Sequence, residues 1–164
     1  MPDPGQHFLR KSAAVLQGEL LPKIKEAVEL LSDQEIWARE GDATNCVGNL
    51  LLHLEGNVRQ HIISGVGGAT DARNRPLEFA ARGGLSKEAL LNKLEETVAE
   101  AAGVLEMLDP AHLLDERMVQ NKNIVLQDDI LHVVEHFAYH AGQIILIAKT
   151  LKQHDFGWYK YLDS

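Results

Sequence analysis

The sequence has a single cysteine, no excess of positive charge and no apolar run at its N-terminus, and each shortage argues against a class of protein. Its single cysteine, Cys46, cannot form an internal disulfide, so disulfide-stapled secreted folds are excluded. The 16 Lys and Arg residues are outnumbered by 24 Asp and Glu residues and are scattered along the chain, which argues against a nucleic-acid-binding surface. The N-terminal stretch MPDPGQHFLR lacks the apolar run of a signal peptide. We therefore expect a cytoplasmic protein that does not bind nucleic acid.

The apolar content suits one soluble domain spanning residues 1–164, large enough to bury a core without staples. One stretch, residues 130–148, is long enough to cross a membrane and has Glu135 as its only formal charge. It also contains four uncharged polar side chains: His132, His136, His140 and Gln143. These groups would be costly in hydrocarbon, so the stretch is predicted to be a core helix rather than a membrane span.

Four segments place apolar residues at helical spacing, and no segment pair alternates as paired strands do. The predicted helices cover about residues 6–31, 46–64, 86–108 and 128–151. This pattern predicts an all-α protein, an up-down four-helix bundle.

Several residues predict where these helices begin, bend and end. Pro22 removes a backbone donor inside the first helix, so we expect a kink or a break there. Asn45 and Ser86 are candidate N-caps of the second and third helices, and Asp109 with Pro110 ends the third. Ser32 and Glu35 have the spacing of a capping box.

Three segments outside the predicted helices also carry expectations. Residues 65–84 have no helical period and predict a long loop, a candidate lid over a site. Residues 111–127 are irregular. The aromatic residues of the C-terminal tail, 154–164, predict that it packs back on the bundle.

The fourth predicted helix carries three histidines on one stripe. His132, His136 and His140 follow each other at four-residue spacing, which stacks their rings on one helix face. A pair at this spacing can present two ring nitrogens to one metal ion. By itself the spacing is weak evidence, because buried histidines also serve as ordinary core residues.

The second predicted helix strengthens the metal interpretation. It has a stripe of uncharged polar residues where a solvated face would carry charges: Asn49, His53, Asn57 and Gln60. Bundles build metal sites from side chains on facing helices, so His53 opposite His136 and His140 gives three nitrogens and leaves one position open. We therefore predict one divalent ion, with zinc or nickel favoured and iron or copper also compatible with imidazoles.

Other polar residues are assigned supporting roles. His132 is left out of the ligand set because it lies a full turn away, where it supports a ligand or faces solvent. Asn49, Asn57 and Gln143 are expected to orient ligand rings or hold a polar group of the substrate. Cys46 lies about 10 Å along the helix from His53, so it is expected to be a small packed residue.

The segments NLLLHLEGNVRQHI and HVVEHFAYHAGQIILIAK resemble the two metal-binding helices of the DinB superfamily. The matching residues are His53, Gly56 and Asn57 in the first and His136, His140, Gly142 and Gln143 in the second. The segment RNRPLEF, residues 73–79, is similar to a loop of one uncharacterised branch of that superfamily.

This resemblance implies a homodimeric metalloprotein acting on a small-molecule substrate. Its better-known relatives are thiol-dependent S-transferases and isomerases that use bacillithiol, mycothiol or glutathione. We accordingly expect a low-molecular-weight thiol as co-substrate, with Arg73 and Arg75 of the lid meeting its carboxylate. For the dimer, the small residues Ala138 and Gly142 beside Leu146 offer a face for close helix approach.

Two other functions stay open. A metal-dependent hydrolase needs a general base, and no Glu follows a ligand as in HExxH helices; Glu135 lies about 100° round the helix from His136. A metal-stabilised scaffold without catalysis is the non-enzyme alternative, and a closed set of four protein ligands would favour it.

Overall fold

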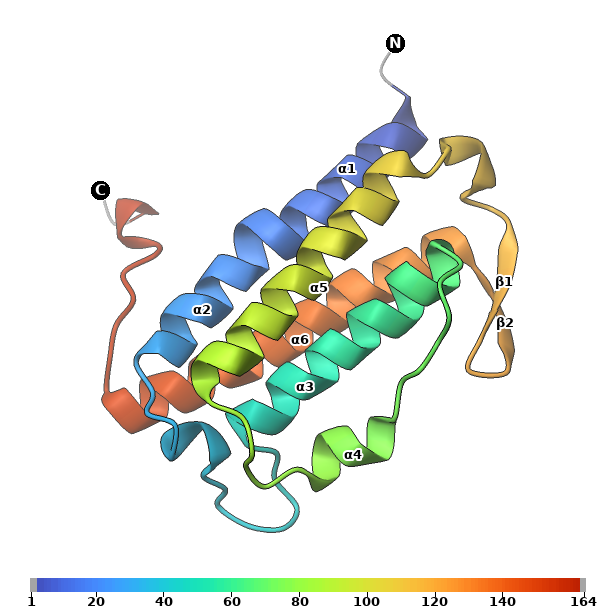
Figure 1. The fold of residues 1–164 in the computed structure, drawn as a ribbon. Helices are drawn as coiled ribbons and strands as arrows, with labels where there is room; N and C mark the ends of the chain where they lie inside the picture. Colours follow the sequence, from blue (N-terminus) through green and yellow to red (C-terminus); the bar gives the residue numbers. More distant parts are fainter. Residues whose placement is uncertain (1–2, 163–164) are drawn as a thin grey trace.

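Four long helical rods pack side by side in the computed structural model, which describes residues 3–162 (Figure 1). The first rod joins α1 (Pro4–Ala14), a π-helical segment (Val15–Leu20) and α2 (Leu21–Glu29). The second joins α3 (Val47–Val58) to another π-helical segment (Arg59–Val66), and the other two are α5 (Lys87–Met107) and α6 (Leu126–Lys152). Shorter elements are α4 (Arg75–Ala80), β1 (Glu116–Val119), β2 (Lys122–Val125) and 3-10 turns at Glu35–Trp37, Pro110–His112 and Lys160–Leu162.

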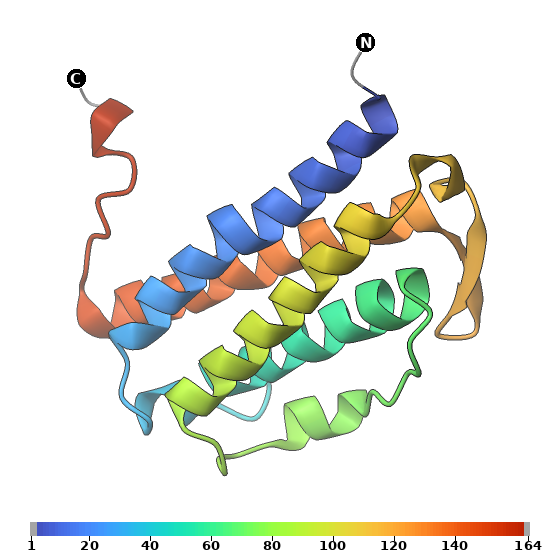
Figure 2. The same cartoon turned by 45° about the horizontal axis from the view of Figure 1, so that its top comes forward.

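The predicted all-α bundle is confirmed, and its rods reverse direction at two of the three connections between them. Figures 1 and 2 show α3 antiparallel to the first rod and α6 antiparallel to α5. By contrast, α3 and α5 run in the same direction, because the connection that carries α4 returns along the outside of the bundle before α5 begins. Bundles with one long crossover of this kind are a known variant of the four-helix architecture. The arrangement sets α3 beside α6 with opposite direction, which positions the site described below.

Helix starts follow the predicted capping chemistry at two places and differ at a third. The Ser86 hydroxyl accepts from the backbone N–H of Ala89, and Ser32 and Glu35 exchange the two bonds of a capping box. Asn45 was the wrong cap: the N-cap of α3 is Cys46, whose backbone N–H and thiol both face the amide oxygen of Asn49. Cys46 is buried there as a small packed residue.

Pro22 does not break the first rod. A π-helical segment directly precedes it, in which the Leu21 N–H bonds the carbonyl of Leu16, five residues back. Such a wide turn shifts the hydrogen-bond pattern where proline cannot contribute. The predicted disturbance is therefore present as a π-helical segment within a continuous helix.

The apolar stripes of all four rods meet in one core. Phe137 is the largest fully buried side chain, and leucines and isoleucines from each rod surround it. Burying each such side chain stabilises the fold by roughly 1.5–3 kcal/mol, so this core holds the two ligand-bearing helices in fixed register. Large buried members from the four rods are Leu9, Leu16, Ile24, Leu50, Leu54, Ile62, Leu94, Ile130, Phe137 and Ile144.

Two connections contain regular structure that the sequence patterns missed. The predicted loop 65–84 holds α4, which packs against α3. The irregular segment 111–127 holds an antiparallel hairpin of β1 and β2, so the expectation of no strand pair was wrong there. Its two-residue turn, Gln120 and Asn121, has positive φ at both positions (49° and 62°), the geometry of a type I′ turn.

The C-terminal tail packs back on the bundle as predicted. The indole N–H of Trp158 donates to Glu26 over 2.7 Å, and the Lys23 ammonium donates to the Tyr159 hydroxyl over 2.9 Å. The ring of Phe156 stacks on Trp158 and contacts the core. Figure 1 accordingly shows the tail running beside α2.

Among the described helices, α6 alone is long and apolar enough to span a membrane by length and composition. In the structure it is one of the four rods, and it contacts α2 and α3 along its length. This placement agrees with the predicted core helix.

Candidate metal centre

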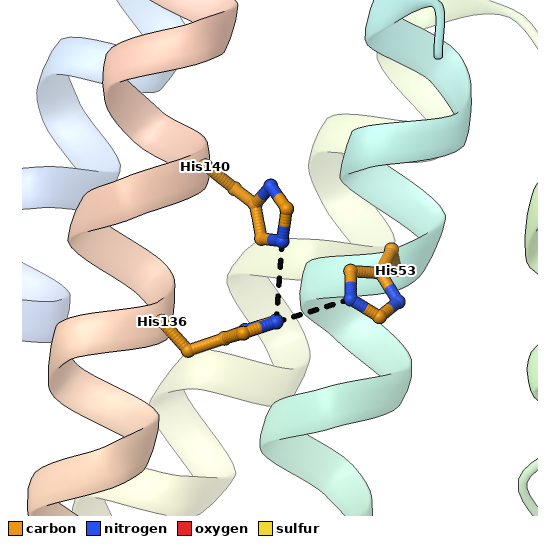
Figure 3. Close-up of side chains that lie close together, drawn as sticks. All are labelled: His53, His136 and His140. Atoms are coloured by element: carbon orange, nitrogen blue, oxygen red, sulfur yellow. Dashed lines mark hydrogen bonds between the residues drawn. The ribbon is translucent and has the colours of Figure 1, made fainter. Parts of the chain in front are cut away.

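Three histidine nitrogens converge between α3 and α6. His53 points from α3 toward His136 and His140 on α6, as Figure 3 shows. The Nε2 atom of His136 lies 3.1 Å from Nε2 of His53 and 3.2 Å from Nε2 of His140. One ligand atom from each residue lies within 4.8 Å of the others. The structure thus brings together the three predicted ligands.

The ring of His53 is oriented by a carboxylate that the sequence analysis did not identify. Its Nδ1 lies 2.8 Å from Oε2 of Glu78, on α4, and 3.0 Å from Nη2 of Arg73; because the carboxylate can only accept, we assign Nδ1 a proton that it donates to Glu78. A proton on Nδ1 leaves Nε2 with a free lone pair, which is the form of imidazole that binds metals. Glu78 therefore completes a carboxylate–histidine pair of the kind that supports metal ligands.

The ring of His140 is fixed in the same tautomer. Its Nδ1–H donates to the amide oxygen of Gln143 over 2.7 Å, one turn further along α6. With Nδ1 protonated in both His53 and His140, two bare Nε2 lone pairs face the Nε2 of His136 at about 3 Å, and either a proton on that nitrogen or a cation between the three nitrogens satisfies them. The convergence of the three nitrogens is therefore compatible with a bound metal ion.

The environment also keeps the rings of His136 and His140 neutral. Burial, reinforced by His140 and His53, lowers the pKa of His136 from 6.5 to about 3. Burial likewise lowers the pKa of His140, although its bond to Gln143 opposes the shift. Neutral imidazoles are required for metal binding, so His136 and His140 need no deprotonation near neutral pH.

Glu78 stays ionised despite its burial. Burial alone would raise its pKa, but hydrogen bonds from Arg73 and His53 outweigh it and leave the pKa lowered. Arg73 donates to both carboxylate oxygens, over 2.7 Å and 2.9 Å, and to the amide oxygen of Gln60. Arg73 was predicted to meet a carboxylate of the thiol co-substrate, and in the structure it instead pairs with the chain's own carboxylate, Glu78.

Gly56 explains how Glu78 comes so close to α3. A Cβ at this position would overlap the Glu78 carboxylate and touch the Arg73 guanidinium. Glycine therefore lets the α4 segment approach the helix that carries His53. Glycine next to Asn57 in the second predicted helix was the one sequence signal for this approach.

The remaining predicted site residues divide between structure and the open site. Asn49 donates to the carbonyls of Glu78 and Ala81, so it ties down α4 and lies away from the triad. Asn57 is buried, and its side-chain oxygen has no hydrogen-bond partner. His132 is exposed, with its ring 5.5 Å from that of His136. Arg75 lies over the ring of Phe79, 4.9 Å from its centroid.

A cleft of about 470 Å³ opens beside the triad. It extends from His53 and His136 past Asn57 to the β hairpin, and its lining includes Arg75, Lys122 and His132. Its volume suits a small molecule. The predicted ligands thus adjoin a space where a substrate can bind.

Comparisons with solved structures show the same fold. A conserved protein from Enterococcus faecalis matches with a TM-score of 0.68 at 16% identity, over 84% of this chain and 93% of that chain. A DinB-like protein from Bacillus cereus matches with a TM-score of 0.64 at 11% identity, over 80% of this chain and 85% of that chain. The chain therefore has a DinB-like fold, and its histidine cluster is compatible with metal binding.

Two further comparisons concern sequence. No curated protein matches the chain. The family model described as protein of unknown function (DUF1572) matches residues 3–161, nearly the whole chain. The chain therefore belongs to the DUF1572 family.

Proposed function

We propose that the protein is a metal-dependent enzyme that binds one divalent ion, zinc or nickel, through His53, His136 and His140. The observation that carries this proposal is the convergence of three Nε2 atoms, two of which have their Nδ1 protons assigned by Glu78 and Gln143. The described residues supply no fourth ligand to this cluster. A three-ligand site with an open position favours chemistry over a purely structural role.

The reaction we favour is thiol-dependent S-transfer or isomerisation on a small molecule bound in the cleft. When bound, the ion acts as a Lewis acid that lowers the pKa of a coordinated thiol or water. The chain's own residues hold the ligand rings, through Glu78 and Gln143, and shield one side of the site, through Arg73 and Phe79. Arg75 and Lys122 line the cleft together with Asp128 and Asp129, and these two cations can pair with an anionic group of a thiol co-substrate.

A specific observation keeps hydrolysis as the second candidate. The sequence lacks a glutamate base beside the α6 ligands, but the cleft contains a second histidine–carboxylate pair, His61 with Asp129. A base in this position would serve water as well as a thiol. Thiol transfer and hydrolysis can be distinguished by testing a thiol with an electrophile against an ester or an amide.

Metal content is the first test. Elemental analysis of protein purified without chelator and incubated with zinc or nickel should give close to one ion per chain. His136→Ala should remove most of it, whereas His112→Ala, an exposed histidine that also bonds a carboxylate, should not. Absence of metal from the unaltered chain after this incubation would overturn the proposal.

Turnover is the second test. Loaded and metal-free protein are compared with bacillithiol, mycothiol, glutathione or cysteine plus an alkylating electrophile, and separately with esters and amides. Metal-dependent thiol conjugation supports S-transfer. Turnover of an ester or amide alone replaces it with hydrolysis, and no turnover of either kind leaves the scaffold function as the better account.

A further inference from the structure

A second histidine–carboxylate pair lies in the same cleft and is not used by the metal centre. His61, in the π-helical segment after α3, bonds through Nδ1 to Oδ1 of Asp129 on α6 over 2.7 Å. Both side chains are nearly inaccessible, with His61 4% and Asp129 1% exposed. Both also line the cleft. Buried titratable pairs in a cleft are candidates for chemistry.

This pair is separate from the triad. The ring of His132 lies between them, 5.4 Å from the ring of His61 and 5.5 Å from that of His136. Within residues 3–162, the triad is the only group of three or more ligand atoms that converge as a metal site requires. His61 and Asp129 are therefore not part of such a group, although they line the same cleft as His53 and His136.

The hydrogen bond assigns a role to each nitrogen of His61. A carboxylate accepts hydrogen bonds, so Nδ1 carries the proton that Asp129 receives. In the neutral ring, Nε2 is then an acceptor, and no hydrogen bond joins it to another residue of the described chain. An imidazole oriented by a carboxylate, with its other nitrogen turned to the substrate, is the arrangement that general bases use.

We propose that His61, oriented by Asp129, is the proton acceptor and donor for the molecule bound in the cleft, an inference that rests on the proposed function. Nε2 accepts a proton from an O–H, N–H or S–H group of that molecule, and the bonding electron pair stays on the heteroatom, which uses it to form the new bond to the electrophilic atom that carries the leaving group. The imidazolium that forms is balanced by the Asp129 carboxylate. Nε2 then returns the same proton to the leaving group, which takes with it the electron pair of the broken bond, so His61 ends as it began.

The chain contains a matched control for this pair. His112 bonds Asp115 through Nδ1 over the same 2.7 Å, but both residues lie outside the cleft, with side chains 55% and 42% exposed. The hydrogen bond is the same in the two pairs, and the position is different. A molecule that fills the cleft should therefore change the reactivity of His61 and leave that of His112 unchanged.

The first experiment uses the unaltered, metal-loaded protein and needs no substrate. Long-range nitrogen–proton NMR spectra report the tautomer of each ring, and we expect His61 in the Nδ1–H form. Diethyl pyrocarbonate, which acylates unprotonated imidazole nitrogens, should modify His61 despite its burial, as mapped by mass spectrometry. A small molecule that fills the cleft, including a thiol from the panel above, should protect His61 and leave His112 reactive. An Nε2–H tautomer, or no acylation while His112 reacts, overturns the proposal.

The second experiment separates this proposal from the metal proposal. His61→Gln and Asp129→Asn should keep close to one ion per chain, and Asp115→Asn is the control. In the turnover panel the first two should lower kcat about a hundredfold while KM changes little, and the control should not. Undiminished kcat in His61→Gln overturns the role of His61. Loss of metal binding in the unaltered chain, with His61 still in the Nδ1–H form and reactive, overturns only the metal centre.

Discussion

Replacing Glu78 by glutamine should weaken metal binding without touching a ligand. Glu78 accepts the Nδ1 proton of His53 over 2.8 Å and holds that ring in its ligating tautomer. Loss of a carboxylate partner of a ligating histidine typically lowers metal affinity about 10- to 100-fold. By the rule that 1.4 kcal/mol is tenfold, this corresponds to about 1.4–2.8 kcal/mol of binding free energy.

The same substitution also leaves a buried charge without its partner, and this effect must be separated from the first. The Arg73 side chain is 4% exposed and pairs with Glu78, so Glu78→Gln should destabilise the fold by about 3–5 kcal/mol. The double variant Arg73→Met with Glu78→Gln removes both charges and should recover much of that stability. If Glu78 orients His53, the double variant should still bind metal more weakly than the unaltered protein.

The assay is competition with a chelator of known affinity, run far below the unfolding temperature, with circular dichroism to confirm the fold. Wild-type affinity in a folded Glu78→Gln variant would refute the reasoning. Recovery of full affinity in the double variant would show that the effect came from stability alone.

Four other outcomes follow from the structure. Gly56→Ala should lower both the melting temperature and the metal affinity, because the added Cβ would overlap the Glu78 carboxylate. Gly142→Ala is the control: its Cβ would meet open space, so it should change neither quantity in the monomer. In metal-free protein, the pKa of His136 is lowered from 6.5 to about 3, so between these pH values the folded state binds fewer protons than the unfolded state. The free energy of unfolding should therefore be highest above about pH 6.5 and should fall as the pH drops toward 3. Denaturant titrations at several pH values check this direction. Asn57→Ala should reduce turnover more than metal content, since Asn57 lines the cleft and is not a metal ligand. We still expect a homodimer through the exposed face of α6, where Leu146 is 64% exposed, and light scattering of Leu146→Glu against wild type at micromolar concentration should show dissociation.

The periodic spacing of apolar residues predicted the four rods, and the polar stripes predicted that the helices carrying His53 and His136 face each other. The apolar spacing of α3 and α6 and the four-residue step between His136 and His140 are local features, so one sequence is enough to find them. The opposing position of His53 also followed, because a stripe of uncharged polar residues on an amphipathic helix indicates buried groups that need a partner or a ligand.

The parts that could not be predicted depend on distant contacts. Glu78 lies on a six-residue helix whose docking depends on Asn49, Gly56 and Arg73, and no period reveals such contacts. His61 was missed for a geometric reason. Eight residues after His53, a regular helix would turn it about 80° away from the ligand stripe, but the chain there is π-helical and has a wider turn. The β hairpin was hidden because its turn lacks the glycine that usually marks one.

The docking of α4 through Glu78 couples the metal centre to a segment outside the bundle. Anything that strengthens the bond between His53 and Glu78 also holds α4 against α3, and a ligand that binds only the docked form must stabilise it by mass action. Metal binding should therefore stabilise the docked position of α4, and the docked position should strengthen metal binding. Adding metal should slow proteolysis and amide exchange between residues 68 and 84, and anything that pulls this segment away should release the ion.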